Sequence, residues 1–187
     1  MSLARPPVPG KECGSCTLCC KLPAIAVLNK PRGVWCSHAL PGRGCGIYEE
    51  RPGICRDFHC EWMVNAGLGP EWKPATCKFV MFMAPDGNLS VLADSGYPDA
   101  WRNPRYYPWL KTKAARMMEH NKLVVVLAGP DMIVILPSRD ERLRVPDGHL
   151  VHVTSERTSR GMTYKVSTLP QAAAQPDSDK AHMSSVS

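Results

Sequence analysis

From about residue 70 the pattern of the chain changes, and short apolar runs separated by turn residues predict β-strands. Apolar runs at 78–84 and 89–93 flank the sequence Pro85-Asp86-Gly87-Asn88. Gly and Asn residues between two such runs are typical of the turn of a β-hairpin. The pattern therefore predicts one hairpin in this part of the chain.

Two further pairs of apolar runs follow. The runs at 122–128 and 132–136 flank Gly129-Pro130-Asp131, a sequence that favours a turn. The runs at 149–154 and 162–167 have a weaker pattern of the same kind. These segments predict a second and a third hairpin.

One amphipathic helix is predicted between the first two hairpins. Pro108 suits the first turn of a helix, and the helical pattern continues to about Asn121. Strands on both sides of one main helix predict a small α+β module over residues 70–168, with an antiparallel sheet. The apolar residues that recur at steps of three and four are Leu110, Ala114, Met117 and Met118.

Residues 11–62 show no such periodicity. This segment is rich in Gly, Pro and Cys and has few large apolar residues, so packing alone should not fold it. We expect an irregular, cysteine-rich metal-binding domain, because a bound metal can supply the missing stability. The segments 1–10 and 169–187 have little to bury and are predicted to be disordered tails.

The main candidate for chemistry is a cluster of thiols in the irregular segment. Thiols at this density require a metal, an iron–sulfur cluster or disulfides to hold them. The ninth cysteine, Cys77, precedes a predicted strand and is expected to be a small buried residue. The eight candidate metal ligands are Cys13, Cys16, Cys19, Cys20, Cys36, Cys45, Cys55 and Cys60.

The spacing of the first cysteines identifies the class of site but not the metal. Cys13, Cys16 and Cys19 follow a C-x2-C-x2-C pattern that suits three ligands of an iron–sulfur cluster. Zinc is equally compatible if Cys13 and Cys16 pair with two later cysteines. Because adjacent side chains diverge, we expect either that Cys19 and Cys20 serve two different sites or that one of them is not a ligand. Eight thiols allow two four-thiolate sites, or one site with additional reactive thiols.

The expected cellular compartment bears on whether the cysteines bind a metal or form disulfides. Residues 1–10 contain three prolines and no apolar core of a secretory signal, which predicts a cytoplasmic protein. Reducing conditions favour metal binding over structural disulfides. The longest apolar run, 123–129, is too short to cross a bilayer, so no membrane contact is expected.

The charge distribution argues against nucleic acid as a partner. The net charge of +6 is spread along the chain and contains no basic run. Residues 1–62 carry eight Lys or Arg against five Asp or Glu. Four thiolates around a divalent cation carry a charge of −2, which nearby cations such as Arg51 and Arg56 would offset.

The cysteine pattern resembles that of the YkgJ-type cysteine-cluster family. The resemblance covers residues 11–62 and rests on two motifs that occur together. One is Cys13-x2-Cys16-x2-Cys19-Cys20, and the other is the closing sequence Cys45-Gly46-Ile47-Tyr48-Glu49-Glu50-Arg51-Pro52-Gly53-Ile54-Cys55-Arg56-Asp57-Phe58-His59-Cys60. The family is described as a zinc- or iron-chelating domain. The resemblance thus implies metal chelation by the eight cysteines.

Two other classes of function remain open from the sequence. A related cysteine cluster occurs in flagellin lysine N-methylases, which would make the chain an iron–sulfur-dependent enzyme. A zinc-ribbon-like adaptor for nucleic acid or protein is the third class. No catalytic residue is singled out among so many thiols, and we do not predict an enzyme. His38 and His59 neighbour cysteines but are not needed as ligands.

A first prediction concerns the structural role of the metal. Treatment with a chelator, or the substitution Cys16→Ser, should unfold residues 11–62 while sparing the α+β module, because the segment lacks its own core. Circular dichroism and limited proteolysis would measure this. A segment that is unchanged after metal removal would contradict the structural role.

Overall fold

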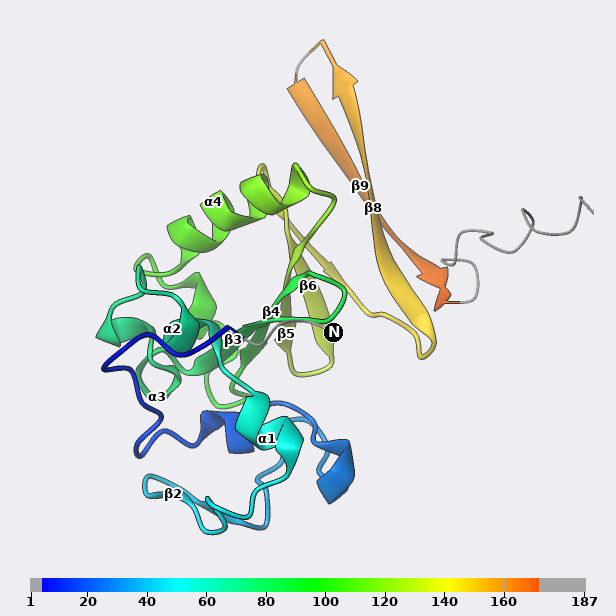
Figure 1. Ribbon diagram of the computed structural model, residues 1–187. Helices are drawn as coiled ribbons and strands as arrows, with labels where there is room; N and C mark the ends of the chain where they lie inside the picture. The colour runs from blue at the N-terminus through cyan, green and yellow to red at the C-terminus, as the bar shows by residue number, and fades with distance from the viewer. Residues whose placement is uncertain (1–4, 160, 172–187) are drawn as a thin grey trace, which may run out of the picture. The chain divides into compact units, whose positions relative to one another are not determined.

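The fold was analysed in a computed structural model, which describes residues 5–159 and 161–171. The chain divides into two compact units, Met1–Arg142 and Leu143–Ser187. Each unit is described by itself. The first contains the cysteine-rich segment and a five-stranded sheet, and the class is α+β, as predicted (Figure 1).

The sheet of the first unit has the strand order β3-β4-β5-β6-β7. Strands β3 and β4 pair antiparallel from Phe79↔Ala93 to Met83↔Leu89, and β5 and β6 pair antiparallel from Val124↔Ile135 to Ala128↔Asp131. Both predicted hairpins are therefore confirmed. The strands are β3 (Phe79–Met83), β4 (Leu89–Ala93), β5 (Val124–Ala128), β6 (Asp131–Ile135) and β7 (Asp140–Leu143).

The expectation of a purely antiparallel sheet is wrong at one pairing. Strands β4 and β5 are parallel, with Leu89 opposite Val124 and Leu92 opposite Leu127. Helix α4 (Tyr107–Met118) lies between them in sequence. The helical crossover carries the chain back to the end of the sheet where β4 begins, so β5 runs parallel to β4.

Helix α4 buries the face that its periodicity indicates. Leu110, Ala114 and Met117 are buried, and Met118 is half-buried at the edge of the same face. Trp101, which precedes the helix, is fully buried. The helix therefore packs through a narrow apolar stripe.

The cysteine-rich segment contains only short elements, in agreement with its irregular composition. Its longest helix has five residues, and its two strands have two residues each. The short elements of the first unit are η1 (Leu18–Cys20), η2 (Ala26–Leu28), β1 (Ala39–Leu40), β2 (Gly44–Cys45), α1 (Gly53–Asp57), α2 (Glu61–Val64), η3 (Pro70–Trp72), α3 (Pro74–Cys77) and η4 (Ala100–Arg102).

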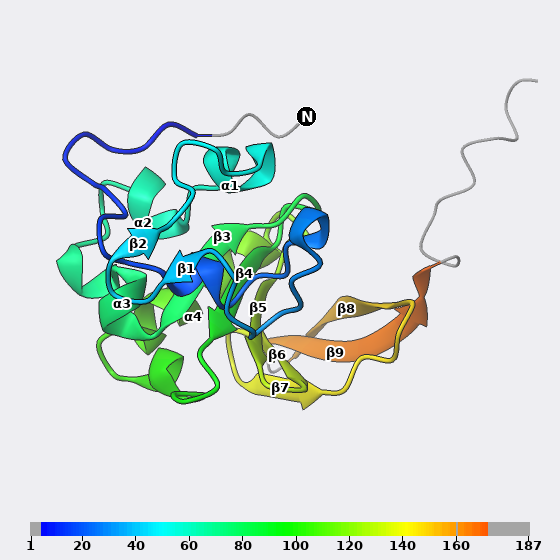
Figure 2. The same ribbon diagram turned by 90° about the horizontal axis from the view of Figure 1, so that it is seen from below.

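The sheet separates α4 from the cysteine-rich segment. Figure 1 shows α4 on one side of strands β3–β6 and the segment from η1 to α1 on the other. In Figure 2, seen from below, the same segment lies in front of the sheet with α4 behind it. Both faces of the sheet are thus covered, which explains why nearly all residues of β4 are buried.

One apolar core joins the sheet to the two ends of the cysteine-rich segment. Leu22, Trp62 and Met63 belong to the same buried cluster as Phe79 and Val126. Between Leu22 and Cys60, by contrast, the buried hydrophobic residues of this described stretch are Ile25 and Cys36 alone. The compact unit therefore extends across the predicted boundary between 62 and 70, and the middle of the segment has almost no core of its own.

The second unit contains the third predicted hairpin, which is confirmed. Strand β8 (His149–Thr158) pairs antiparallel with β9 (Gly161–Pro170), from His149↔Pro170 to Thr158↔Gly161. Most of its described side chains are exposed or half-buried. Residues 1–4 and 172–187 lie outside the described part, so most of the C-terminal tail and part of the N-terminal tail cannot be compared with the prediction.

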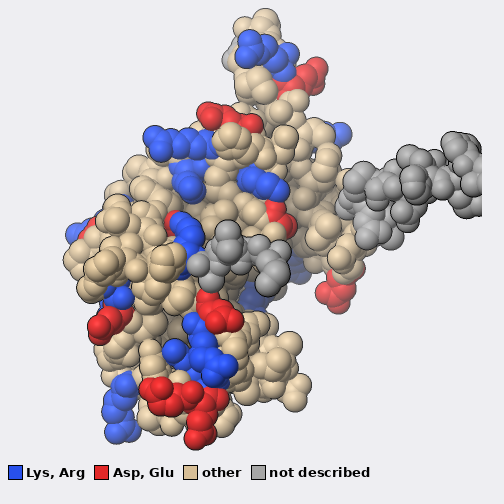
Figure 3. All heavy atoms as spheres, viewed as in Figure 1, with Lys and Arg blue, Asp and Glu red and all other residues tan. Residues whose placement is uncertain are grey.

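On the face shown in Figure 3, Lys and Arg side chains are interspersed with Asp and Glu. Within the described residues, every helix is too short or too polar to traverse a bilayer.

The packing of α4 generates a prediction on stability. Leu110 is fully buried, so Leu110→Ala should lower the free energy of unfolding of the first unit by about 2–5 kcal/mol. Arg116 lies on the exposed face of the same helix, and Arg116→Ala should change it by less than about 0.5 kcal/mol. Urea denaturation would measure both values. Equal effects of the two substitutions would contradict this packing.

Candidate metal centre

All eight predicted ligands line one cavity of about 540 Å³ in the first unit. The ninth cysteine, Cys77, is buried outside it, where its thiol contacts the carbonyl oxygens of Trp72 and Phe79. Burial raises the pKa of Cys77 to about 12, so this thiol stays protonated. The structure thus separates the eight clustered cysteines from the ninth as the sequence pattern predicts.

One wall of the cavity is the face of the sheet opposite α4. Phe82, Leu92 and Leu127 contribute apolar side chains from three neighbouring strands. Phe58, from the cysteine-rich segment, also lines the cavity and stacks edge-on against Phe82, with ring centroids 5.4 Å apart. The thiols therefore line a cavity with a largely apolar wall, in which the energetic effect of charge is large.

The start of the first cysteine motif is attached to the end of helix α2. The Lys11 ammonium donates hydrogen bonds to the carbonyl oxygens of Trp62, Asn65 and Leu68, at 3.0, 2.7 and 2.6 Å. Carbonyl groups at a helix end lack partners within the helix, and a cation satisfies them well. This interaction holds Cys13 close to the α2 region.

The end of the same motif is attached to the sheet. Lys21 Nζ lies 2.7 Å from Asp94 Oδ1, directly after β4, and Asp94 also accepts a hydrogen bond from the Gly96 N–H. Burial by itself would raise the pKa of Asp94, but the hydrogen bonds from Lys21 and Gly96 and the lysine charge outweigh it and lower that pKa. Lys11 and Lys21 thus hold the segment Cys13–Cys20 in place at its two ends.

A third lysine is buried beside the cysteines. Lys30 is only 6% exposed, and its ammonium donates to the carbonyl oxygens of Lys21, Pro23 and Pro31. Burial lowers the pKa of Lys30, whereas the charges of nearby cysteines raise it. Sequence reasoning missed the roles of all three lysines, since nothing in their spacing distinguishes them from surface lysines.

Arg51 and Arg56 were both expected to offset the charge of the thiolates. The structure places them differently. Arg51 lines the cavity and stacks over the Tyr48 ring at 3.7 Å, and its Nε is buried without a hydrogen-bond partner among the described residues. Arg56 is exposed. A buried N–H without an acceptor is costly, and it suits a site where a thiolate sulfur would accept a hydrogen bond.

The adjacent cysteines Cys19 and Cys20 affect each other's ionisation. The interaction between the two thiols raises the pKa of Cys19 strongly and lowers that of Cys20 to about 7. Lys30 and Arg51 also favour the Cys20 thiolate. Of the pair, Cys20 therefore ionises first.

Burial opposes ionisation at other positions around the cavity. It raises the pKa of Cys60 to about 11 and also raises the pKa values of Cys13 and Cys55. The negative charges of neighbouring cysteines add to each of these shifts. The thiols consequently need a counter-charge if they are to ionise together.

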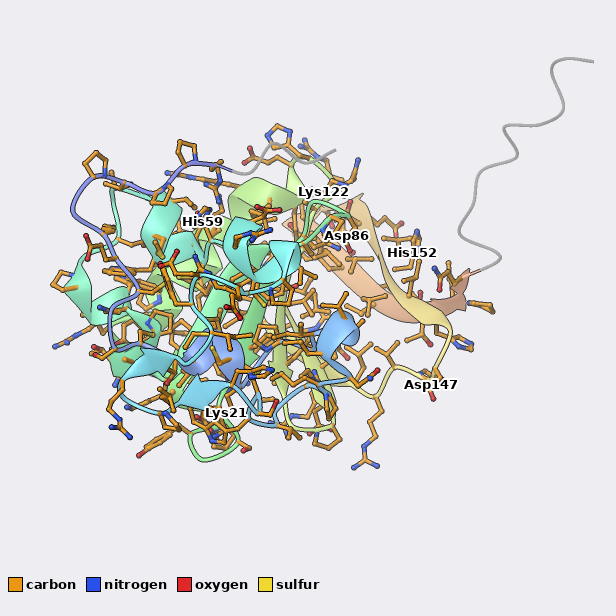
Figure 4. The ribbon with its side chains drawn as sticks, turned by 60° about the horizontal axis from the view of Figure 1, so that its bottom comes forward. Lys21, His59, Asp86, Lys122, Asp147 and His152 are labelled. Atoms are coloured by element: carbon orange, nitrogen blue, oxygen red, sulfur yellow. The ribbon has the colours of Figure 1, made fainter. Side chains whose placement is uncertain are left out.

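The two histidines considered as alternative ligands lie in different surroundings. His38 lines the cavity, whereas His59 does not. His59 Nδ1 is buried without a hydrogen-bond partner among the described residues. Figure 4 shows His59 well apart from Lys21. Neither observation assigns a ligand role to these side chains.

All nine cysteines belong to the described part of the chain, and all are free thiols. In the range 5–159 and 161–171, no three His, Cys, Asp or Glu side chains come as close together as a metal ion requires. The eight thiols line one cavity but do not form a closed coordination shell.

Comparison with known proteins gives no match. No family model, no curated protein and no solved structure matches the chain.

The Lys21–Asp94 pair generates a prediction with a pH dependence. Lys21→Met should destabilise the first unit by roughly 2 kcal/mol at pH 7, because it leaves a buried carboxylate without its charged donor. Since the pKa of Asp94 is lowered in the folded state, the stabilisation exists above its unfolded pKa and is lost as the pH falls through the folded value. The difference between wild type and variant should therefore shrink below about pH 4.

Urea denaturation between pH 2.5 and pH 7 would measure this difference. Lys21→Arg keeps a charged donor and serves as the matched control, which should retain most of the stability. A Lys21→Met penalty that does not change with pH would contradict a role for the ion pair.

Proposed function

We propose that this chain is a metal-binding protein that holds zinc or an iron–sulfur cluster through its eight clustered cysteines. The observation that supports this most strongly is the location of all eight thiols around one cavity, with Cys77 outside it. Residues more than forty positions apart in sequence, such as Cys13 and Cys60, contribute to the same cavity. Thiolates are the preferred protein ligands of zinc and of iron–sulfur clusters.

The weak packing of the segment supports a structural role for the metal. Between Leu22 and Cys60, few apolar side chains are buried, and the elements there are too short to be stable alone. When bound, the metal would crosslink distant parts of this segment through metal–thiolate bonds. Its binding free energy would then contribute directly to folding.

The charges around the cavity support thiolate ligation. Four thiolates around one divalent cation leave a charge of −2, which a buried environment makes unfavourable unless cations lie nearby. Lys30 and Arg51 occupy such positions, and the unpartnered Arg51 Nε would gain an acceptor in a thiolate sulfur. The resemblance of residues 11–62 to the YkgJ-type cysteine cluster supports the same function.

The proposal is tested by purifying the full chain without oxygen and analysing its metal content. Bound zinc in a colourless protein, or iron and sulfide in a brown protein with visible absorption, would support it and would identify the metal. Cys77→Ala, which removes the thiol outside the cavity, should leave the metal content unchanged. Cys16→Ala should reduce it, because one ligand is lost.

A chain that retains neither zinc nor iron under these conditions would overturn the proposal. Equal metal loss in Cys77→Ala and Cys16→Ala would also overturn the assignment of the eight cysteines. Near-ultraviolet circular dichroism of the tryptophans in the apolar core would show that each variant is folded.

A further inference from the structure

The residues just before the first cysteine motif form an arm that lies against helix α2. This N-terminal arm, residues 5–11, is drawn in dark blue in Figure 1 and runs beside α2. The Val8 N–H donates to the Met63 carbonyl oxygen at 2.8 Å. The Lys11 ammonium donates to the carbonyl oxygens within and after α2, as described above. The arm is therefore attached to α2 at several points along its length.

An ion pair with a buried carboxylate also joins the arm to α2. Arg5 pairs with Glu61, which is only 2% exposed and directly follows Cys60 in sequence. Glu61 also accepts a hydrogen bond from Asn65 Nδ2 at 3.2 Å. Burying a carboxylate is costly unless it is paired and hydrogen-bonded. Arg5 therefore stabilises the first residue of α2 in its buried position.

Met63 connects the arm to the cysteines at the two ends of the thiol-rich segment. Its Sδ lies 3.2 Å from Cys13 Sγ, and its N–H donates to the Cys60 carbonyl oxygen at 2.9 Å. The same residue accepts the hydrogen bond from Val8. Because Cys13 and Cys60 both line the cavity, contacts that fix Met63 and α2 also fix these two residues at its wall.

The composition of the arm lowers the entropic cost of ordering it. Pro6, Pro7 and Pro9 restrict the backbone, because each proline ring fixes its own φ angle. A chain with fewer accessible conformations loses less entropy when it becomes ordered. Few contacts are therefore needed to hold the arm against α2.

We propose that the N-terminal arm is a clasp for the metal centre and that Arg5 is its positioning residue. Arg5 acts through Glu61, which keeps the start of α2, and with it Cys60, beside Cys13. This inference rests on the proposed metal-binding function and adds to it a determinant that lies outside the cysteine motifs. Ligands that are already held in place cost less to order on binding. The clasp should therefore slow the release of the metal without changing the amount bound at saturation.

Arg5 can be substituted without touching the thiols. Its side chain is 49% exposed, and it does not line the cavity. Arg5→Met removes the charged donor, whereas Arg5→Lys keeps one. A matched control is Arg139→Met, because the Arg139 side chain is 46% exposed and pairs with Glu141 in the same unit.

The first measurement is the rate of metal release from the full chain, purified without oxygen. The protein is mixed with an excess of a chromogenic chelator of zinc and iron, and the transfer of metal is followed by absorbance. Arg5→Met should release the metal roughly three to ten times faster than wild type, since it removes a charged but partly solvent-screened partner of a buried carboxylate. Arg5→Lys and Arg139→Met should release it at nearly the wild-type rate. All these proteins should hold the same amount of metal at saturation.

The second measurement is hydrogen exchange of the backbone amides, followed by mass spectrometry of peptide fragments. Arg5→Met should speed exchange in residues 5–13 and 60–65 and leave strand β3 and the β1–β2 hairpin unchanged. Val8→Pro provides an independent variant, because it deletes the N–H that donates to Met63. Val8 precedes Pro9, so its backbone already favours the extended regions that proline also adopts. Val8→Pro should change metal release and exchange in the same direction as Arg5→Met.

Several outcomes would overturn the clasp. These are unchanged metal release or unchanged exchange at α2 in both Arg5→Met and Val8→Pro, and an Arg5→Lys variant as defective as Arg5→Met. Faster exchange throughout the sheet would indicate general destabilisation and would equally overturn a positioning role. Failure of the proposed function would instead appear as a wild type that holds no metal. The exchange measurement would then still show whether the arm fixes α2.

Discussion

The central constraint on the first unit is the presence of eight thiols around one partly apolar cavity. Each ionised thiol raises the pKa of its neighbours, and burial at Cys13, Cys55 and Cys60 adds to this effect. The thiols can ionise together only if positive charge is close to them. The buried cation Lys30 provides part of that charge, and under the proposed function a bound metal ion would provide the rest.

The sheet provides the rigid support for this cavity. Its strands contribute one wall, and helix α4 covers the opposite face. The cysteine-rich segment joins this support at defined points, through Lys11 at α2, through Lys21 at Asp94 and through the buried side chain of Leu22. Between these points few apolar side chains are buried, so under the proposed function metal binding would be the main interaction that orders this stretch.

Local patterns predicted much of the fold. The three hairpins and the main helix were predicted because their signals lie within each segment, in the spacing of apolar residues and in turn sequences such as Pro85-Asp86-Gly87-Asn88. The parallel pairing of β4 with β5 was not predicted, because it depends on where α4 returns the chain. Similarly, the shared core of Trp62 and Phe79 joins segments that differ in composition, and composition alone indicated two separate modules.

The density and spacing of the cysteines along the chain are enough to distinguish eight of them from Cys77. The elements whose periodicity is local can likewise be predicted from the chain alone. The shared cavity of the eight thiols, and the lysines that anchor the first motif beside it, become visible only in the folded chain. The same holds for the difference between Arg51, which lines the cavity, and Arg56, which faces solvent. These features depend on contacts between residues distant in sequence, and the spacing along a chain does not specify such contacts.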